Sequence, residues 1–125
     1  MSKTRPLIAI VDDEEPIRKA LTRLLRSAGL DVESFPSGSE FLKSLPTRQP
    51  DCVVLDLHMP VVSGFDVQAD LAKSGMPVVI ITGHDSDETR TRALAGRPAA
   101  YLRKPVNDQI LLDAIELALG IHPQP

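Results

Sequence analysis

Residues able to do chemistry stand at the ends of apolar runs in this 125-residue chain. The run Leu7–Val11 leads directly into four consecutive acids, Asp12, Asp13, Glu14 and Glu15. A carboxylate, a hydroxyl and an amine stand at the ends of three later runs, CVVLD, VVIIT and YLRK, as Asp56, Thr82 and Lys104. Apolar runs are buried, whereas a carboxylate taken out of water without a partner is costly. Carboxylates at the ends of buried strands therefore require a partner that compensates their charge.

Gathered at one site, these groups would suit the transfer of a phosphoryl group. Neighbouring carboxylates repel each other and raise one another's pKa unless a cation is present. A hard divalent ion with oxygen ligands, Mg²⁺ above all, removes that repulsion and usually keeps several waters. A lysine and a hydroxyl opposite the ion could hold the oxygens of a phosphoryl group, whose transfer depends mostly on positioning and charge neutralisation. The chain has neither a G-x-x-x-x-G-K-[ST] nor a G-x-G-x-x-G loop, so a nucleotide is not the obvious donor.

The apolar runs that must position these groups are typical of parallel strands. Residues 7–11, 52–55 and 78–81 are rich in Val and Ile and do not alternate with polar residues, as in strands buried on both faces of a sheet. Shorter strands are expected at residues 30–35 and 99–103.

Helical patterns separate the strands. Residues 17–28 repeat apolar side chains at three- and four-residue spacing, with Pro16 suited to the first turn and Gly29 to the position after the last. Ser37 and Glu40 predict a capping box for a second helix. Three more helices are expected, at residues 64–74, 86–95 and 106–119.

The order of elements is therefore βαβαβαβαβα. Right-handed crossovers give this order a doubly wound, five-stranded parallel sheet with five helices on its two faces. In such sheets a ligand binds beyond the carboxyl ends of the strands, where the strand order reverses. The acids, the threonine and the lysine all fall at that edge.

Composition limits the class of protein. A hydrophobic fraction of 42%, a charged fraction of 25% and a net charge of −3 indicate one soluble domain, expected over residues 1–120 and followed by a tail or the start of a linker at 121–125. The mild acidity predicts no contact with nucleic acid or a membrane surface. No apolar stretch suits a signal peptide or a membrane span. The single cysteine, Cys52, is expected to be a buried free thiol, and a cytoplasmic location follows.

Four segments, VDDEEPIR, VVLDLHMPVVSG, VVIITGH and AYLRKP, occur in this order, and together they resemble the receiver domain of bacterial two-component response regulators. The resemblance extends from Leu7 to Leu119 and implies a flavodoxin-like topology. The TGH further resembles the nitrogen-fixation-regulator-like subgroup, whose receivers are usually joined to a helix-turn-helix DNA-binding domain.

The resemblance implies a phosphorylation-dependent signalling switch rather than an enzyme. Such a domain accepts a phosphoryl group from a sensor histidine kinase, catalyses only its own phosphorylation and dephosphorylation, and changes its partner-binding surface. Control of transcription, through an output domain that this chain does not contain, is the implied result. A stand-alone, single-domain response regulator is the alternative.

Carried over residue by residue, the resemblance makes Asp56 the phosphoacceptor. Mg²⁺ would be held by Asp12, Asp13, Asp56 and the backbone carbonyl of His58. The side chains of His58 and His84 are not expected to act.

The same resemblance assigns the phosphate-binding and switch residues. Lys104, the hydroxyl of Thr82 and the backbone N–H of Gly83 would bind the phosphoryl oxygens. Thr82 and Tyr101 would form the switch, and the Lys104–Pro105 peptide bond would be cis. Glu14 and Glu15 are expected only to begin the next helix, where negative charge suits the helix dipole.

Two segments depart from the family pattern. The stretch between Asp56 and Thr82 is slightly short, so the third helix or its exit loop is expected to be trimmed. Gly96-Arg97-Pro98 stands where the family usually has Gly-Ala, so the fourth helix is expected to end early. This helix is also polar nearly all round, and we expect it to be marginal or mobile.

The last helix is apolar over more than half of its circumference. One face is expected to contain Ile110, Leu111, Ala114, Ile115, Leu117 and Ala118, with Leu112 and Leu119 extending it. Burial on two sides would require a partner, so a homodimer or an output-domain contact is expected through this helix and strand 99–103. A monomer is the alternative, because single exposed leucines are common.

Two other classes share parts of this pattern. A haloacid-dehalogenase-like phosphohydrolase also uses an aspartate nucleophile and Mg²⁺, but it needs a second Asp two residues later, where this chain has His58. A flavodoxin-like electron carrier needs a phosphate-binding loop after the first strand and aromatic rings to stack on a flavin. This chain has no Trp and one Tyr.

Overall fold

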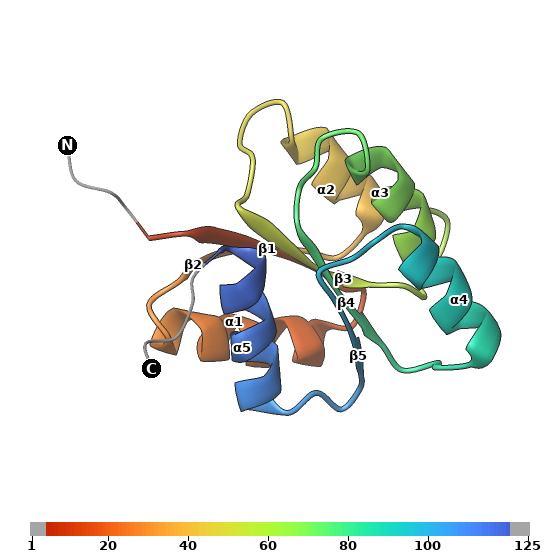
Figure 1. The fold of residues 1–125 in the computed structure, drawn as a ribbon. Coiled ribbons are helices and arrows are strands. Elements are labelled where there is room, and N and C mark those ends of the chain that lie inside the picture. The colour runs from red at the N-terminus through yellow and green to blue at the C-terminus, as the bar shows by residue number, and fades with distance from the viewer. Residues whose placement is uncertain (1–4, 121–125) are drawn as a thin grey trace.

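Strands and helices alternate along the part of the chain that the computed structural model describes, residues 5–120 (Figure 1). The strands are β1 (Leu7–Val11), β2 (Asp31–Phe35), β3 (Cys52–Asp56), β4 (Val78–Thr82) and β5 (Ala100–Arg103). The helices are α1 (Glu15–Ser27), α2 (Gly38–Ser44), α3 (Gly64–Leu71), α4 (Asp87–Ala95) and α5 (Asp108–Ala118). The expected tail at 121–125, with His122, lies outside the described residues.

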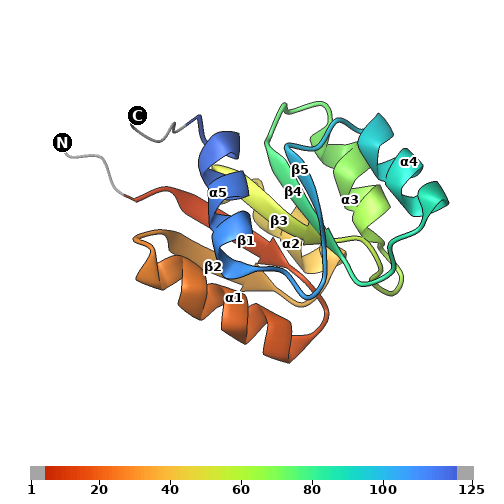
Figure 2. The same cartoon turned by 60° about the horizontal axis from the view of Figure 1, so that its bottom comes forward.

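All neighbouring strands pair in parallel, in the order β2-β1-β3-β4-β5. Every residue of β1, β3 and β4 is buried, which explains why these strands do not alternate in sequence. Helices α1 and α5 cover one face of the sheet, and α2, α3 and α4 lie on the other (Figures 1 and 2). The predicted doubly wound α/β fold is confirmed.

Two hydrophobic cores result, one on each face of the sheet. Alternate residues of β1 face opposite cores: Ala9 and Val11 pack toward Phe41 of α2, whereas Ile8 and Ile10 pack toward Leu25 of α1. Cys52 belongs to the second core, and burial raises the pKa of its thiol to about 12. The prediction of a buried free thiol is confirmed.

The local signals at the ends of α1 act as predicted. Pro16 lies in the first turn. After the last turn, Gly29 has a φ of 89°, and the N–H of Leu30 donates to the carbonyl of Leu25. This is a Schellman stop, in which a left-handed glycine closes the helix.

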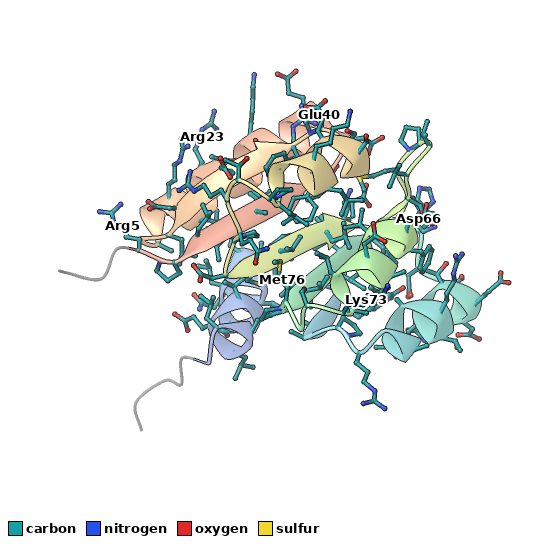
Figure 3. The ribbon with its side chains drawn as sticks, turned by 90° about the horizontal axis from the view of Figure 1, so that it is seen from above. Arg5, Arg23, Glu40, Asp66, Lys73 and Met76 are labelled. Carbon is teal, nitrogen blue, oxygen red and sulfur yellow. The ribbon has the colours of Figure 1, made fainter. Side chains whose placement is uncertain are left out.

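The capping box predicted at the start of α2 is only partly formed. Ser37 accepts a hydrogen bond from the backbone N–H of Glu40 at the start of α2, which is half of the predicted capping box. A reciprocal capping box is found instead at α3, between Ser63 and Asp66. Glu40 and Asp66 are labelled in Figure 3 at the first turns of these two helices.

Helix α3 ends at Leu71 rather than at the predicted residue 74. The Ser74 hydroxyl donates to the Leu71 carbonyl at 2.8 Å and accepts from the N–H of Met76 at 3.2 Å, so a serine side chain replaces the next helical bonds. Gly75 then turns with a φ of 72°. The shortened exit matches the shortened sequence in this segment.

Helix α4 is attached to the rest of the domain by few contacts. Ala93 is its one buried residue, and its carbonyl accepts a 2.8 Å hydrogen bond from Gln68 of α3. The Arg92 guanidinium lies over the Phe65 ring at 4.0 Å from the ring centre. The helix ends at Ala95, before Arg97, which has a φ of 55°. The predicted end at residue 95 is confirmed, and the mobility of α4 stays a prediction.

Candidate functional site

The predicted acids meet at the carboxyl edge of the sheet. Asp12 follows β1 and Asp56 ends β3, two strands that are neighbours at the point where the strand order reverses. A carboxylate oxygen from each of Asp12, Asp13 and Asp56 lies within 4.8 Å of the other two. Asp12 and Asp56 are buried and Asp13 is exposed, so the cluster opens to solvent on one side.

Backbone packing fixes β3 beside α3. The first residue of α3, Gly64, lies so close to β3 that a Cβ there would overlap the carbonyl oxygen of Asp56. The N–H of Gly64 also donates to the carbonyl of Leu57 at 2.9 Å. Only glycine allows this approach, so Gly64 holds Asp56 in place.

Lys104 reaches into the cluster from the residue after β5. Its ammonium nitrogen lies 2.9 Å from Asp12 Oδ2, 2.9 Å from Glu14 Oε1 and 3.6 Å from Asp56 Oδ1. The backbone N–H of Lys104 donates to the carbonyl of Thr82 at 2.8 Å, and the Lys104–Pro105 peptide bond is cis, as predicted. Strand β5 therefore delivers the lysine to the acids.

One lysine does not satisfy this cluster. Asp12 Oδ1 accepts a 2.8 Å hydrogen bond from the N–H of Glu14, but Asp12 Oδ2 has only the ionic contact with Lys104, without a well-aligned hydrogen bond from any described residue. A buried carboxylate oxygen in this state is costly. It is an oxygen ligand available to a cation.

The pKa values of Asp56 and Lys104 are both shifted by the carboxylates gathered at this site. Burial, and then the charge of Asp12, raise the pKa of Asp56 to about 7, although Lys104 and the N–H of His58 act to lower it. Burial alone would lower the pKa of Lys104, but the hydrogen bond to Glu14 and the close ionic contacts with Asp12 and Asp56 outweigh burial and raise it to about 12. A second cation would remove the repulsion that remains between the carboxylates.

Thr82 lies buried at the end of β4, beside β3. Its hydroxyl is 3.3 Å from His58 Nδ1 and accepts a 3.1 Å hydrogen bond from the N–H of His84. The two imidazole rings lie 4.7 Å apart, edge to face. The prediction gave these side chains no role, yet each follows its strand-end residue, Asp56 or Thr82, by two positions. Two residues at the same distance in sequence from the ends of adjacent parallel strands are expected to lie close together, and this signal could have predicted the contact between the two histidines.

Tyr101 lies on β5 and is held by an acid that sequence reasoning missed. Its hydroxyl donates to Asp85 Oδ1 at 2.8 Å, and Arg90 of α4 donates to Asp85 Oδ2 at the same distance. Burial and this hydrogen bond raise the pKa of Tyr101 to about 12. Asp85 precedes α4 and thereby connects that helix to β5.

The apolar surface of α5 differs from the predicted one. Leu111 and Ile115 are buried against the sheet, and Leu112 and Leu119 pack beside them. Ile110 and Leu117 were predicted to share one apolar face with Leu111 and Ile115, but they are 54% and 62% exposed. The predicted single face is wrong, because the helix meets the sheet along its 111/115 ridge and leaves the 110/117 ridge facing away from it.

A comparison with protein families matches the response regulator receiver domain over residues 8–116. The chain belongs to this family. Nodulation protein W of Bradyrhizobium diazoefficiens is 39% identical to the receiver over 119 residues, which are 94% of this chain and 52% of that protein. Transcriptional regulatory protein FixJ of Rhizobium meliloti is 34% identical over 113 residues, 89% of this chain and 55% of that protein.

The receiver also resembles solved structures. A response regulator receiver protein from Burkholderia phymatum has 42% identity and a TM-score of 0.86, covering 97% of this chain and 100% of that one. The predicted family, its subgroup and the fold are confirmed. This chain spans about half the length of the curated relatives described above. Among residues 5–120 no helix is long and apolar enough to cross a membrane.

The raised pKa of Asp56 predicts how stability depends on pH. Between the unfolded value of 3.8 and about 7, the folded receiver holds a proton that the unfolded chain releases, so stability falls as pH rises through this range. Asp56→Asn removes the buried charge. At pH 8, without divalent metal, we expect the variant to be more stable by about 1–4 kcal/mol, since one pKa unit corresponds to about 1.4 kcal/mol.

Urea unfolding in the presence of a chelator at pH 5 and pH 8 measures this difference. The advantage of the variant should shrink toward pH 5. An advantage that is equal at both pH values would contradict the raised pKa.

Proposed function

We propose that this receiver is a phosphorylation-dependent signalling switch in which Asp56 accepts a phosphoryl group from a sensor histidine kinase. The observation that supports it most directly is a buried Asp56 next to two further acids and a lysine. In the reaction a carboxylate oxygen of Asp56 forms a bond to phosphorus as the P–N bond of the phosphohistidine breaks. The leaving imidazole nitrogen keeps the bonding electrons, and because the other ring nitrogen of the phosphohistidine carries a proton, the kinase histidine ends as a neutral imidazole.

A Mg²⁺ ion fits the donor set of this pocket. Asp12, Asp13 and Asp56 would hold it, with the backbone carbonyl of His58 as a further ligand. When bound, the ion supplies the positive charge that neutralises the carboxylates and the phosphoryl oxygens. The carboxylate oxygens gathered within 4.8 Å, and the buried Asp12 Oδ2 without a hydrogen bond from a described residue, support this assignment.

The remaining groups would receive the phosphoryl oxygens and transmit their presence. Lys104 would pair with one oxygen, while the Thr82 hydroxyl and the Gly83 N–H would bind others. To do so, Thr82 must turn from His58 toward Asp56. Tyr101 would respond by leaving Asp85. It is the sole tyrosine in a chain without tryptophan, so intrinsic fluorescence reports on it directly.

The expected partners and location of the receiver are inferred from its relatives and its net charge. FixJ is named a transcriptional regulatory protein, and this chain matches about half of it. We therefore assign residues 1–120 to the receiver and 121–125 to a tail or linker, with transcription controlled through an output domain. A stand-alone regulator is the alternative. The receiver itself would act in the cytoplasm and make no direct contact with nucleic acid.

Phosphorylation of Asp56 can be tested with a small donor. Incubation with acetyl phosphate and Mg²⁺ should add one phosphoryl group by intact-mass measurement, and Asp56→Asn should lose this adduct because the nucleophile is absent. Asp70→Asn, an exposed carboxylate on α3, is the matched control and should keep it. An adduct that persists in Asp56→Asn would refute the assignment.

The metal assignment is tested by Asp13→Ala. Removal of an exposed carboxylate that repels its neighbours should leave the domain folded but weaken Mg²⁺ binding at least about tenfold, because a charged ligand is lost. Calorimetric Mg²⁺ titration measures the affinity. Equal affinities for the variant and the unaltered receiver would reject Asp13 as a ligand.

The exposed ridge of α5 supports a homodimer strengthened by phosphorylation. Ile110 and Leu117 lie one heptad apart, and Ile110 borders a cavity of about 840 Å³ lined from α4, β5 and the start of α5. Ile110→Glu should shift the phosphorylated receiver toward monomer in sedimentation, because it places a charge in the contact, while phosphorylation itself remains. Gln109→Glu, on the polar side of the helix, is the control. A monomer under all conditions would eliminate the dimer.

A further inference from the structure

Glu14 has a side chain that its place in the helix does not explain. It is the N-cap residue of α1, yet its carboxylate makes no capping hydrogen bond to the first turn of that helix. Its backbone N–H is already bonded to Asp12 Oδ1. The carboxylate turns instead toward the pocket, where Oε1 accepts a 2.9 Å hydrogen bond from Lys104.

This contact places Lys104 nearer to Glu14 than to the acceptor. The ammonium is 2.9 Å from Glu14 Oε1 but 3.6 Å from Asp56 Oδ1. Glu14 is 58% exposed, whereas Lys104 is 14% exposed, so the glutamate contacts the lysine from the solvent side of the pocket. A glutamate is ionised at neutral pH, so the contact joins two opposite charges.

Building on the proposed function, we propose that Glu14 is a positioning residue that competes with the phosphoryl group for Lys104. In the unphosphorylated receiver Glu14 and Asp12 share the ammonium. A phosphoryl group on Asp56 brings several anionic oxygens to the same nitrogen, and Lys104 must give up Glu14 to bind them closely. The Glu14 carboxylate also repels the arriving anion. Both effects oppose phosphorylation, so Glu14 holds the switch toward its unphosphorylated state.

The adjacent acid provides a matched control. Glu15 lies in the first turn of the same helix and pairs with Lys19 on the surface of α1, 3.4 Å away. Glu14→Gln and Glu15→Gln remove the same charge from the same helix end. Only the first removes a partner of Lys104.

The test measures binding of beryllofluoride, a mimic of a phosphoryl group on a carboxylate, to the receiver with saturating Mg²⁺. Glu14→Gln should lower its apparent dissociation constant about twofold to fivefold, the range expected for a partly exposed ion pair. Glu15→Gln should match the unaltered receiver. The ratio between the two variants should shrink at high salt, because salt screens the exposed pair.

The outcomes separate this inference from the proposed function. Equal affinities for the two variants, or weaker binding by Glu14→Gln, would overturn the role of Glu14 while leaving Asp56 as acceptor. If the unaltered receiver neither binds beryllofluoride nor gains a phosphoryl group, the proposed function itself fails. Urea unfolding of both variants checks that the effect is not a loss of the fold.

Discussion

The structure depends on the burial of two carboxylates, Asp12 and Asp56, at the ends of neighbouring strands. Burial, and then the repulsion from Asp12, raise the pKa of Asp56, because both disfavour its charged form. Lys104 relieves part of it from a third strand end. The unbalanced charge at this site therefore lowers the stability of the fold. Such perturbed charges are common at functional sites.

The strands that carry these acids are buried in the centre of the sheet. The strands β1, β3 and β4 are buried at every residue, and Gly64 packs directly on the backbone of Asp56. The acids cannot separate without disrupting the sheet. A cation or an added anion must therefore act on the side chains and loops around the site rather than on the sheet itself.

A loop and a helix beside the site are attached to the rest of the domain by few buried contacts. Thr82 is hydrogen-bonded to the loop that leads into α4, and Asp85 in that loop connects Tyr101 to Arg90. Helix α4 buries one residue and is joined to α3 mainly by polar and cation–π contacts. Few buried contacts mean a low local cost of rearrangement, so a change at the site can move this surface.

The sequence by itself determined the fold, because the strand and helix periods, Pro16, Gly29 and Ser37 each act over a few residues. It also determined that Asp12, Asp13, Asp56, Thr82 and Lys104 share one edge, since the carboxyl ends of parallel strands must meet there. Only the tertiary structure decided which side chains touch. Glu14 reaches Lys104, 90 residues away, and Asp85 reaches Tyr101, because of how the loops fold over the sheet. The exposed ridge of α5 was likewise set by the rotation of that helix on the sheet, which an apolar pattern covering more than half of a helix does not specify.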